Sequence, residues 1–509
     1  MPGVRFYLTT PIYYVNATPH IGHAYTTIVA DILARHHRLR GDETFFLTGT
    51  DEHGTNIPRR AAEAGLDVRD FVDRNAAAFE EMTRRINASN DYFIRTTDPR
   101  HEAAVREFVQ RIYDRGDIYE GVYTGLYCPR CEAFYTEAEL VDGKCPVHGI
   151  EPERVEEKNW FFRLSAYQDR LLALYDENPE FVLPRFRYNE ARSFIEQGLD
   201  DISVSRSSEQ WGVRVPWDPE QTVYVWVDAL INYWSALAFA REGEDLRGEF
   251  WPAVRHVLAK DILKFHCVIW PALLLAAGLE VPKQLFVHGY LLFAERKMSK
   301  SLGNVIDPLD LIEFYEGADP LRFYVVREVQ FGQDGNVSVD GVHERYEREL
   351  ANDLGNLVSR TTAMIARYRD GRLPEAPPDS GAGSLATLGS ETAGLLDAFD
   401  VTGALERIWK EIRALNALVE ERKPWELAKD ESKSRELDST LYDLADGLRA
   451  VAIALLPYLP ETAPRILDAL KQPAEPTWDD VAPRKTVAAE GIEPAAPLFP
   501  RVEAPSAAA

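Results

Sequence analysis

The spacing of apolar residues changes period several times along the chain. Residues 4–14, VRFYLTTPIYY, form an almost continuous apolar and β-branched run, which predicts a buried strand. Over 20–40 the period becomes helical, and Gly41 predicts the end of that helix. The apolar face of this helix holds Ile21, Tyr25, Ile28, Ile32 and Leu39. Residues 42–54 predict a second strand. Together the three elements form a βαβ unit, so we expect a parallel sheet with ligands at the carboxyl ends of its strands.

The pattern beyond this unit divides the chain further. Residues 60–115 predict mostly helices, and 116–217 show the short strands and turns of an inserted module. Strand-like patterning then returns and resumes the α/β sheet at 222–234, 254–266 and 283–293.

The last part of the chain is predicted to be helical. A Pro- and Gly-rich loop, 372–384, interrupts it, and the tail 485–509 is expected to be extended or loose. The clearest predicted helices are 345–370, 401–422, 434–456 and 460–471.

Composition narrows the class of protein. The chain has 509 residues, 45% of them hydrophobic, which predicts several packed domains. No run of about 18 apolar residues predicts a membrane span, and the N-terminus lacks a signal peptide, so we expect a cytoplasmic protein. The net charge of −25 argues against a non-specific polyanion binder. This net charge is compatible with a local nucleic-acid binding site.

Three of the four cysteines cluster. CPRC at 128–131 and CPVH at 145–148 supply four candidate ligands, Cys128, Cys131, Cys145 and His148. Such paired knuckles are typical of tetrahedral Zn²⁺ with a closed, structural coordination shell. The alternative is four unrelated loop residues. Cys267 stands alone in an apolar run and is expected in the core.

The segment KMSKS suits a polyphosphate. Its residues are Lys297, Met298, Ser299, Lys300 and Ser301. Lysines neutralise charge that develops on phosphate, and hydroxyls donate hydrogen bonds. By itself the segment also fits an ordinary basic surface turn.

His20 and His23 lie three residues apart around Gly22, at the predicted start of the first helix. They could pack in the core, or bind a metal together with Asp51 or His53. They could also handle phosphate, because a helix N-terminus favours anions and Gly22 allows close approach.

HIGH-type and KMSKS motifs in one α/β chain resemble class I aminoacyl-tRNA synthetases. Within that class the chain resembles the methionyl-tRNA synthetase family along essentially its whole length. PIYYVN, HIGHAY, TGTDEHG, the single zinc knuckle, YVWVDALINY, AKDILKFH, KMSKS and KPW occur in family order. One visible departure is Ala259, where the family usually has glycine.

The resemblance implies an α/β fold: a Rossmann-like parallel-sheet catalytic domain with a zinc-binding insertion, followed by an α-helical bundle that binds the anticodon. The implied boundaries are 1–115 and 218–292 for the two catalytic halves, 116–217 for the insertion, 293–345 for the KMSKS and stem-contact region, 346–475 for the bundle and 476–509 for the tail.

The resemblance also implies roles for site residues. His20, His23, Lys297 and Lys300 would be catalytic. ATP would contact these four residues, Gly22, Met298, Ser299, Ser301 and, through its ribose, Asp261. Asp51 would hold the methionine ammonium. The remaining methionine-binding residues would be Ile12, Tyr14, Trp226, Ala229, Leu230, Tyr233, Ile262 and His266. Asn356, Arg360 and Trp425 would bind the anticodon, although Trp425 also fits a helix-packing role.

The implied activity is ATP-dependent attachment of L-methionine to initiator and elongator tRNA(Met) through methionyl-adenylate. Mg²⁺ would accompany ATP, and one structural Zn²⁺ would be bound per chain. We expect a monomer, because the chain ends without the dimerising domain of some family members. The alternatives are another HIGH-containing nucleotidyl transferase and a non-catalytic tRNA-binding protein on the same scaffold.

Overall fold

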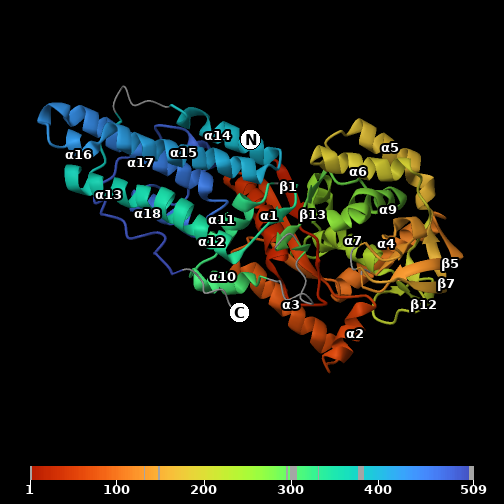
Figure 1. The fold of residues 1–509 in the computed structure, drawn as a ribbon. Helices are drawn as coiled ribbons and strands as arrows, with labels where there is room; N and C mark the ends of the chain where they lie inside the picture. Colours follow the sequence, from red (N-terminus) through yellow and green to blue (C-terminus); the bar gives the residue numbers. More distant parts are fainter. Residues whose placement is uncertain are drawn as a thin grey trace.

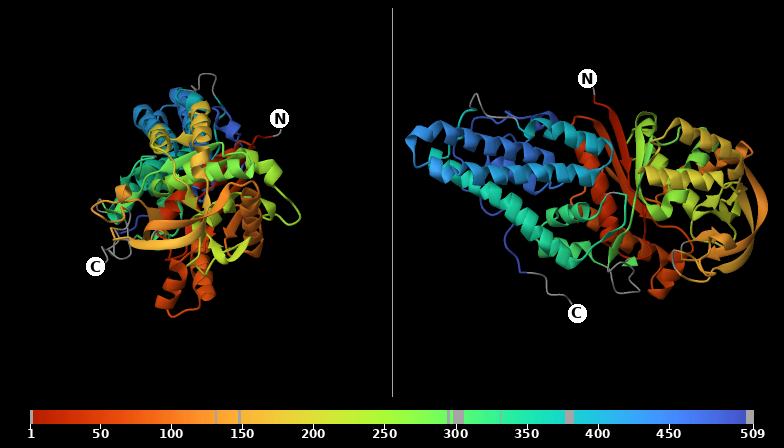
Figure 2. Two further views of the ribbon diagram at one scale, coloured as in Figure 1. Left: turned by 90° about the vertical axis from the view of Figure 1, so that its right-hand side faces the viewer. Right: turned by 45° about the horizontal axis from the view of Figure 1, so that its top comes forward.

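The structure is a computed structural model that describes residues 3–130, 132–146, 149–293, 296–297, 306–330, 332–376 and 383–503. A helical bundle, a central parallel sheet and a smaller β-rich module follow one another along the long axis of the molecule (Figures 1 and 2). Among the described residues, no helix is long and apolar enough to cross a bilayer.

The central sheet has seven strands, and every pairing in it is parallel, as the βαβ pattern predicts. β1 pairs with the first half of β3, and β2 pairs with its end, so β2 continues β1 after the break at Pro11. The strands are β1 (Arg5–Thr9), β2 (Tyr13–Tyr14), β3 (Glu43–Asp51), β4 (Tyr92–Arg95), β8 (Val182–Leu183), β13 (Val254–Ala259) and β14 (Gln284–His288).

Helices cover both faces of this sheet. On one face Phe6 and Leu8 pack with α1 (Ile21–Leu39) and α3 (Val68–Arg85). On the other face Tyr7 packs with α4 (Pro99–Asp114), α7 (Val225–Ser235) and α9 (Trp270–Ala277). Alternate residues of one strand therefore enter opposite cores, which explains why the strand is apolar throughout. Two shorter helices are α2 (Asn56–Glu63) and α8 (Arg247–Phe250).

The prediction of strand structure over 222–234 was partly wrong. Strand β12 (Asp218–Val223) ends at once, and the rest of the segment is helix α7. Almost all of α7 is buried, the polar Asp228, Asn232 and Ser235 included, and its short apolar runs fit a strand as well as a helix. In the same way, 254–266 is a strand only to Ala259 and then becomes 3₁₀ and π turns.

The inserted module contains two helices in addition to the predicted short strands and turns. Its antiparallel sheet consists of β5 (Ile118–Cys128), β6 (Ala133–Tyr135), β7 (Glu153–Phe162) and β9 (Ile202–Ser203). Helices α5 (Gln168–Glu177) and α6 (Arg185–Glu196) lie between β7 and β9 in the sequence. β8 lies within this stretch of sequence yet joins the edge of the central sheet. Two small sheets complete the β-structure, one of β10 (Ser205–Arg206), β12 and β11 (Arg214–Val215), the other of β16 (Arg296–Lys297), β15 (Leu291–Phe293) and β17 (Gly335–Asn336).

The C-terminal part is helical, as predicted. α10 (Pro308–Phe314), α11 (Asp319–Glu328) and α12 (Val339–Arg345) lead through a π-helical turn to the bundle. The bundle consists of α13 (Asn356–Arg369), α14 (Leu385–Asp397), α15 (Val401–Arg422), α16 (Pro424–Leu427), α17 (Ser434–Leu455) and α18 (Thr462–Ala469).

The described part of the tail has no helix or strand beyond residue 481, but it is not loose. Ile492, Leu498 and Phe499 are buried in the bundle core, and the Tyr346 hydroxyl donates to the carbonyl of Pro500. Apolar anchors at wide intervals do not produce a helical or strand period, so the pattern did not predict this packing.

Candidate active site

A cavity of about 390 Å³ opens at the carboxyl end of the central sheet. Four strands reach it with their last residues, Tyr14 of β2, Asp51 of β3, Ala259 of β13 and His288 of β14. The backbone of Ala259 has a φ of −83°, so glycine is not needed there. Every described residue predicted to bind methionine lines this cavity, and so do His20, Gly22, His23 and Asp261.

The start of α1 presents two imidazoles to the cavity. His20 is the N-cap residue: its Nδ1 accepts from the amide of Gly22 at 3.1 Å, and its own amide donates to Nδ1 of His23 at 3.1 Å. The rings stack with centroids 3.8 Å apart. Because both Nδ1 atoms accept hydrogen bonds, a neutral ring carries its proton on Nε2. This arrangement presents two N–H donors at a helix N-terminus, which suits an anion and disfavours metal ligation through Nε2.

Asp51 is a buried carboxylate with like charges near it. Its Oδ1 has no hydrogen-bond partner among the described atoms. Burial, followed by the nearby charges of Asp228 and Glu132, raises the pKa of Asp51 well above its usual value. A cation bound in the cavity would relieve this cost, so Asp51 suits a substrate ammonium group.

The apolar wall of the cavity is built around two coupled side chains. His266 donates from Nδ1 to the carbonyl of Ile262 at 3.0 Å, so its Nε2 accepts from the Tyr233 hydroxyl at 2.7 Å. Burial lowers the pKa of His266 to about 4, which keeps the ring neutral. Trp226 stacks on Phe265 at a centroid distance of 4.0 Å. The wall is therefore aromatic and uncharged.

Sequence reasoning missed Glu132. This residue lines the cavity and is almost fully buried; its Oε1 accepts from the Tyr14 hydroxyl at 2.8 Å and from the amide of Asn56 at 2.6 Å. Burial raises the pKa of its carboxyl to about 7. No local motif marks Glu132 as a site residue, because it reaches the cavity only when the β5–β6 turn folds back over β2.

Comparison with known proteins agrees with this geometry. The sequence model of a family described as "tRNA synthetases class I (M)" matches residues 6–154 and 138–362. A methionine--tRNA ligase of Caldanaerobacter subterraneus is 44% identical over 98% of this chain and 79% of its own length, and that of Bacillus subtilis is 42% identical over 98% and 78%. The chain belongs to the methionyl-tRNA synthetase family.

Solved structures of this family have the same fold. A Mycobacterium tuberculosis methionyl-tRNA synthetase in complex with methionyl-adenylate matches at 42% identity and a TM-score of 0.93, over 98% of this chain and 100% of that one. The apo form from the same organism matches at 39% identity and a TM-score of 0.86, over 99% of both chains.

The described residues on either side of KMSKS lie beside the cavity. Lys297 lies in β16, which pairs with β15, and Leu291 of β15 lines the cavity. At the other end, the carbonyl of Ile306 accepts from the amide of Ile21, next to His20. Met298, Ser299, Lys300 and Ser301 lie outside the described residues.

Two of the four predicted zinc ligands of this methionyl-tRNA synthetase family member lie among the described residues. Cys131 and His148 lie outside the described residues, and no group of three possible ligands occurs among the rest. Cys128 and Cys145 are both buried. Cys145 lies in a tight turn: its amide donates to the carbonyl of Ile150 and its carbonyl accepts from Gly149, both at 2.8 Å. Two buried thiols, one of them in a knuckle-like turn, fit a structural zinc site. Cys267 is buried in the core, as predicted.

The three predicted anticodon residues lie on the bundle. Asn356 is exposed at the start of α13, and Arg360 lies one turn later. The guanidinium of Arg360 lies 5.9 Å from the ring centroid of Trp425 and donates to Glu420 at 2.7 Å. Trp425 is half-buried, so part of its ring packs on the bundle and part remains accessible.

Proposed function

We propose that this protein attaches L-methionine to initiator and elongator tRNA(Met) in two steps. A carboxylate oxygen of methionine attacks the α-phosphorus of ATP, which forms methionyl-adenylate and releases pyrophosphate. A hydroxyl of the terminal tRNA adenosine then attacks the methionyl carbonyl, and AMP leaves. Family membership and the geometry of the cavity support this assignment.

One observation carries the proposal: a single cavity combines an uncompensated buried carboxylate, a neutral aromatic wall and two imidazole donors at a helix N-terminus. Asp51 would bind the ammonium group. The wall around Tyr233 and His266 would receive the thioether, which is apolar and polarizable. This arrangement would leave the methionine carboxylate directed toward the start of α1.

The residues of the cavity would act mainly by alignment and charge stabilisation. His20 and His23 would donate from Nε2 to the phosphate oxygens as charge builds on them, and Asp261 would bind the ribose. Lys297 and Lys300 would neutralise the leaving pyrophosphate, with Met298, Ser299 and Ser301 completing the loop. The described residues on either side of KMSKS lie beside the cavity, which supports a contact of this motif with ATP.

Two metal ions belong to the proposal. Mg²⁺ would enter with ATP and screen its phosphates. Cys128, Cys131, Cys145 and His148 would hold a structural Zn²⁺ that stabilises the turns of the insertion, so the ion takes no part in the reaction.

Anticodon recognition would use Asn356, Arg360 and Trp425. Single-stranded RNA is recognised by stacking on aromatic rings and by hydrogen bonds to base edges. The accessible part of the Trp425 ring suits the first role, and the polar ends of Asn356 and Arg360 suit the second. We also propose a monomer that works in the cytoplasm, where ATP, methionine and tRNA are available to it.

Pyrophosphate exchange into ATP, measured with each amino acid in turn, tests the assignment. Methionine alone should support exchange, and the purified protein should then charge tRNA(Met). Exchange without any charging would favour the alternative of a small-molecule nucleotidyl transferase. Absence of exchange with every amino acid would favour a non-catalytic tRNA-binding protein.

A further inference from the structure

An ion pair with no side-chain exposure lies where the catalytic sheet meets the helical bundle. Arg322 of α11 donates from a terminal nitrogen to Oδ2 of Asp31 on α1 at 2.7 Å. Buried arginine is uncommon, and it is retained only where its donors are satisfied. The proposed chemistry gives neither residue a role.

The guanidinium of Arg322 joins three separate parts of the chain. Its Nε donates to the carbonyl of Tyr458 at 3.0 Å, and a terminal nitrogen donates to that of Pro457 at 2.8 Å; both follow α17 of the bundle. The other terminal nitrogen donates to the carbonyl of Ile86, at the end of α3, at 3.0 Å. Because these donors are fixed in one plane, they hold the bundle and the catalytic helices in one relative orientation.

Asp31 transfers this orientation to α1. Its Oδ1 accepts from the amide and the hydroxyl of Ser89, and its Oδ2 accepts from Arg35 as well as Arg322. Burial would raise the pKa of Asp31, but Arg322 and then Arg35 outweigh it and hold the pKa below its usual value. Asp31 is eleven residues after His20, or about 17 Å along the axis of a rigid helix. A shift of Asp31 would therefore move the imidazoles in the cavity.

The same junction is connected to the anticodon end of the bundle. The Tyr458 hydroxyl donates to the carbonyl of Val401, the first residue of α15. Arg360 pairs with Glu420 near the other end of α15, and Trp425 follows shortly after. The 22 residues of α15 span about 33 Å as a continuous rod. A reorientation of the bundle at Trp425 would therefore displace the carbonyls that Arg322 binds.

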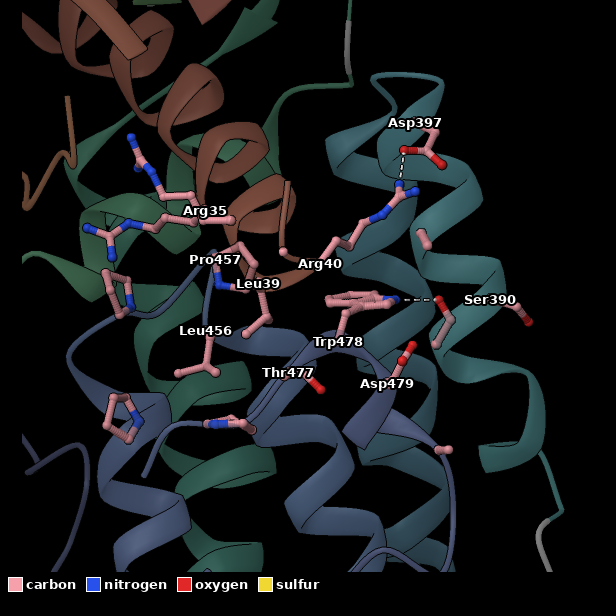
Figure 3. Close-up of a pocket in the computed structure, with 18 of the residues that line it drawn as sticks. Arg35, Leu39, Arg40, Ser390, Asp397, Leu456, Pro457, Thr477, Trp478 and Asp479 are labelled. Carbon is pink, nitrogen blue, oxygen red and sulfur yellow. Dashed lines mark hydrogen bonds and ion pairs between the residues drawn. The ribbon is translucent and has the colours of Figure 1, made fainter. Parts of the chain in front are cut away.

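The junction is not fully packed. A groove of about 1020 Å³ runs between the last turn of α1 and the bundle (Figure 3). Arg35 and Pro457, both partners in the buried network, line it, and an ion pair of Arg40 with Asp397 bridges it at 2.5 Å. Open space beside a buried joint allows a small rotation without a clash in a packed core.

We propose that Arg322 and Asp31 are positioning residues that couple anticodon binding on the bundle to the placement of His20 and His23. This inference rests on the proposed function. It assigns the ion pair a role in the transfer step, in which His20 and His23 would hold the α-phosphate of the adenylate as AMP leaves. Adenylation needs no tRNA and therefore no signal from the bundle.

Arg322→Lys tests the coupling. Lysine keeps one positive charge beside Asp31, but its three N–H donors cannot serve Asp31 and the three backbone carbonyls together. We expect methionine-dependent pyrophosphate exchange within about twofold of the unmodified protein, and charging of tRNA(Met) slower by about tenfold, a usual size for coupling between sites. Changing one anticodon base in the tRNA should then impair charging less in the variant than in the unmodified protein.

Arg35→Lys is the matched control. Arg35 also pairs with Asp31, yet among the described residues its hydrogen bonds go to Asp31 and Asn87, both on the catalytic side. Charging and exchange should both stay near the unmodified values. If Arg322→Lys does not fold, Tyr458→Phe removes the hydrogen bond to Val401 on the bundle side of the junction, leaves Asp31 untouched and should show the same split.

A parallel loss of exchange and charging, or an undiminished effect of the anticodon change, would overturn the coupling. These results differ from a failure of the proposed function, in which the unmodified protein itself shows no methionine-dependent exchange.

Discussion

Replacing Asp51 with asparagine should separate substrate binding from stability. Asparagine has nearly the same shape, so the change removes charge and little volume. In the structure the Asp51 carboxylate is buried, one oxygen has no partner, and Asp228 and Glu132 add like charge. Methionine should lose its counter-ion, whereas the unliganded protein should lose a source of repulsion.

The size of the binding effect follows from the burial of the site. Removing one partner of a buried, hydrogen-bonded charge pair costs about 2–5 kcal/mol. Because asparagine can still accept a hydrogen bond from the ammonium group, we expect the lower part of this range, or about 100-fold in kcat/KM for methionine. The KM for ATP should change little.

Asp51→Asn should stabilise the unliganded protein, although it weakens methionine binding. The folded pKa of Asp51 is raised, so its contribution to the free energy of unfolding is present below about pH 3.9 and is lost as the pH rises through the raised value. Above that value the charged carboxylate destabilises the unliganded protein. At neutral pH Asp51→Asn should therefore melt at a higher temperature than the unmodified protein, and the difference should shrink toward acid pH.

Pyrophosphate exchange at varied methionine concentration measures the first effect, and thermal melting without ligand measures the second. Asp67→Asn, at an exposed helix cap, makes the same charge change and should alter neither. An unchanged kcat/KM for methionine, or a lower melting temperature for Asp51→Asn, would refute this account of the site.

Three further predictions concern other parts of the molecule. Tyr233→Phe leaves Nε2 of His266 without its donor, so the free energy of unfolding, measured with denaturant, should fall by about 1–3 kcal/mol; an unchanged free energy of unfolding would contradict the role of the pair. Cys128→Ser should remove zinc measured by elemental analysis, whereas Cys267→Ala should keep it; equal zinc in both variants would exclude Cys128 as a ligand. Trp425→Ala should weaken tRNA charging by about 5- to 150-fold, the value of one stacked base, while exchange stays near normal; an equal loss of both would contradict the anticodon role.

Local features could be predicted because their causes are local. The helix after His20 begins and ends within two residues of its prediction, since caps and glycine act on adjacent backbone groups. The helix predicted over 401–422 has those same bounds, because one of its faces is strongly apolar. The prediction failed for α7 because this helix is buried almost all round, its polar residues Asp228, Asn232 and Ser235 included, and its short apolar runs fit a strand as well as a helix.

The residues of the sequence motifs also predicted the lining of the cavity. His20, Asp51, Tyr233 and His266 come from four segments of the sequence, and the structure brings all of them to the end of one parallel sheet. That convergence follows from the βαβ order, which places the carboxyl ends of the strands at one edge. The sequence by itself therefore determined the fold class, the family and most of the cavity lining.

Only the tertiary structure decided how these side chains are paired. Tyr233 donates to His266, Glu132 reaches Tyr14 from the insertion, and Arg322 meets Asp31 across the domain junction. Each pair depends on the packing of elements far apart in sequence, and neither partner carries a local signal of the other. Hydrogen bonds and ion pairs require atoms within about 3 Å, and only the folded chain sets such distances.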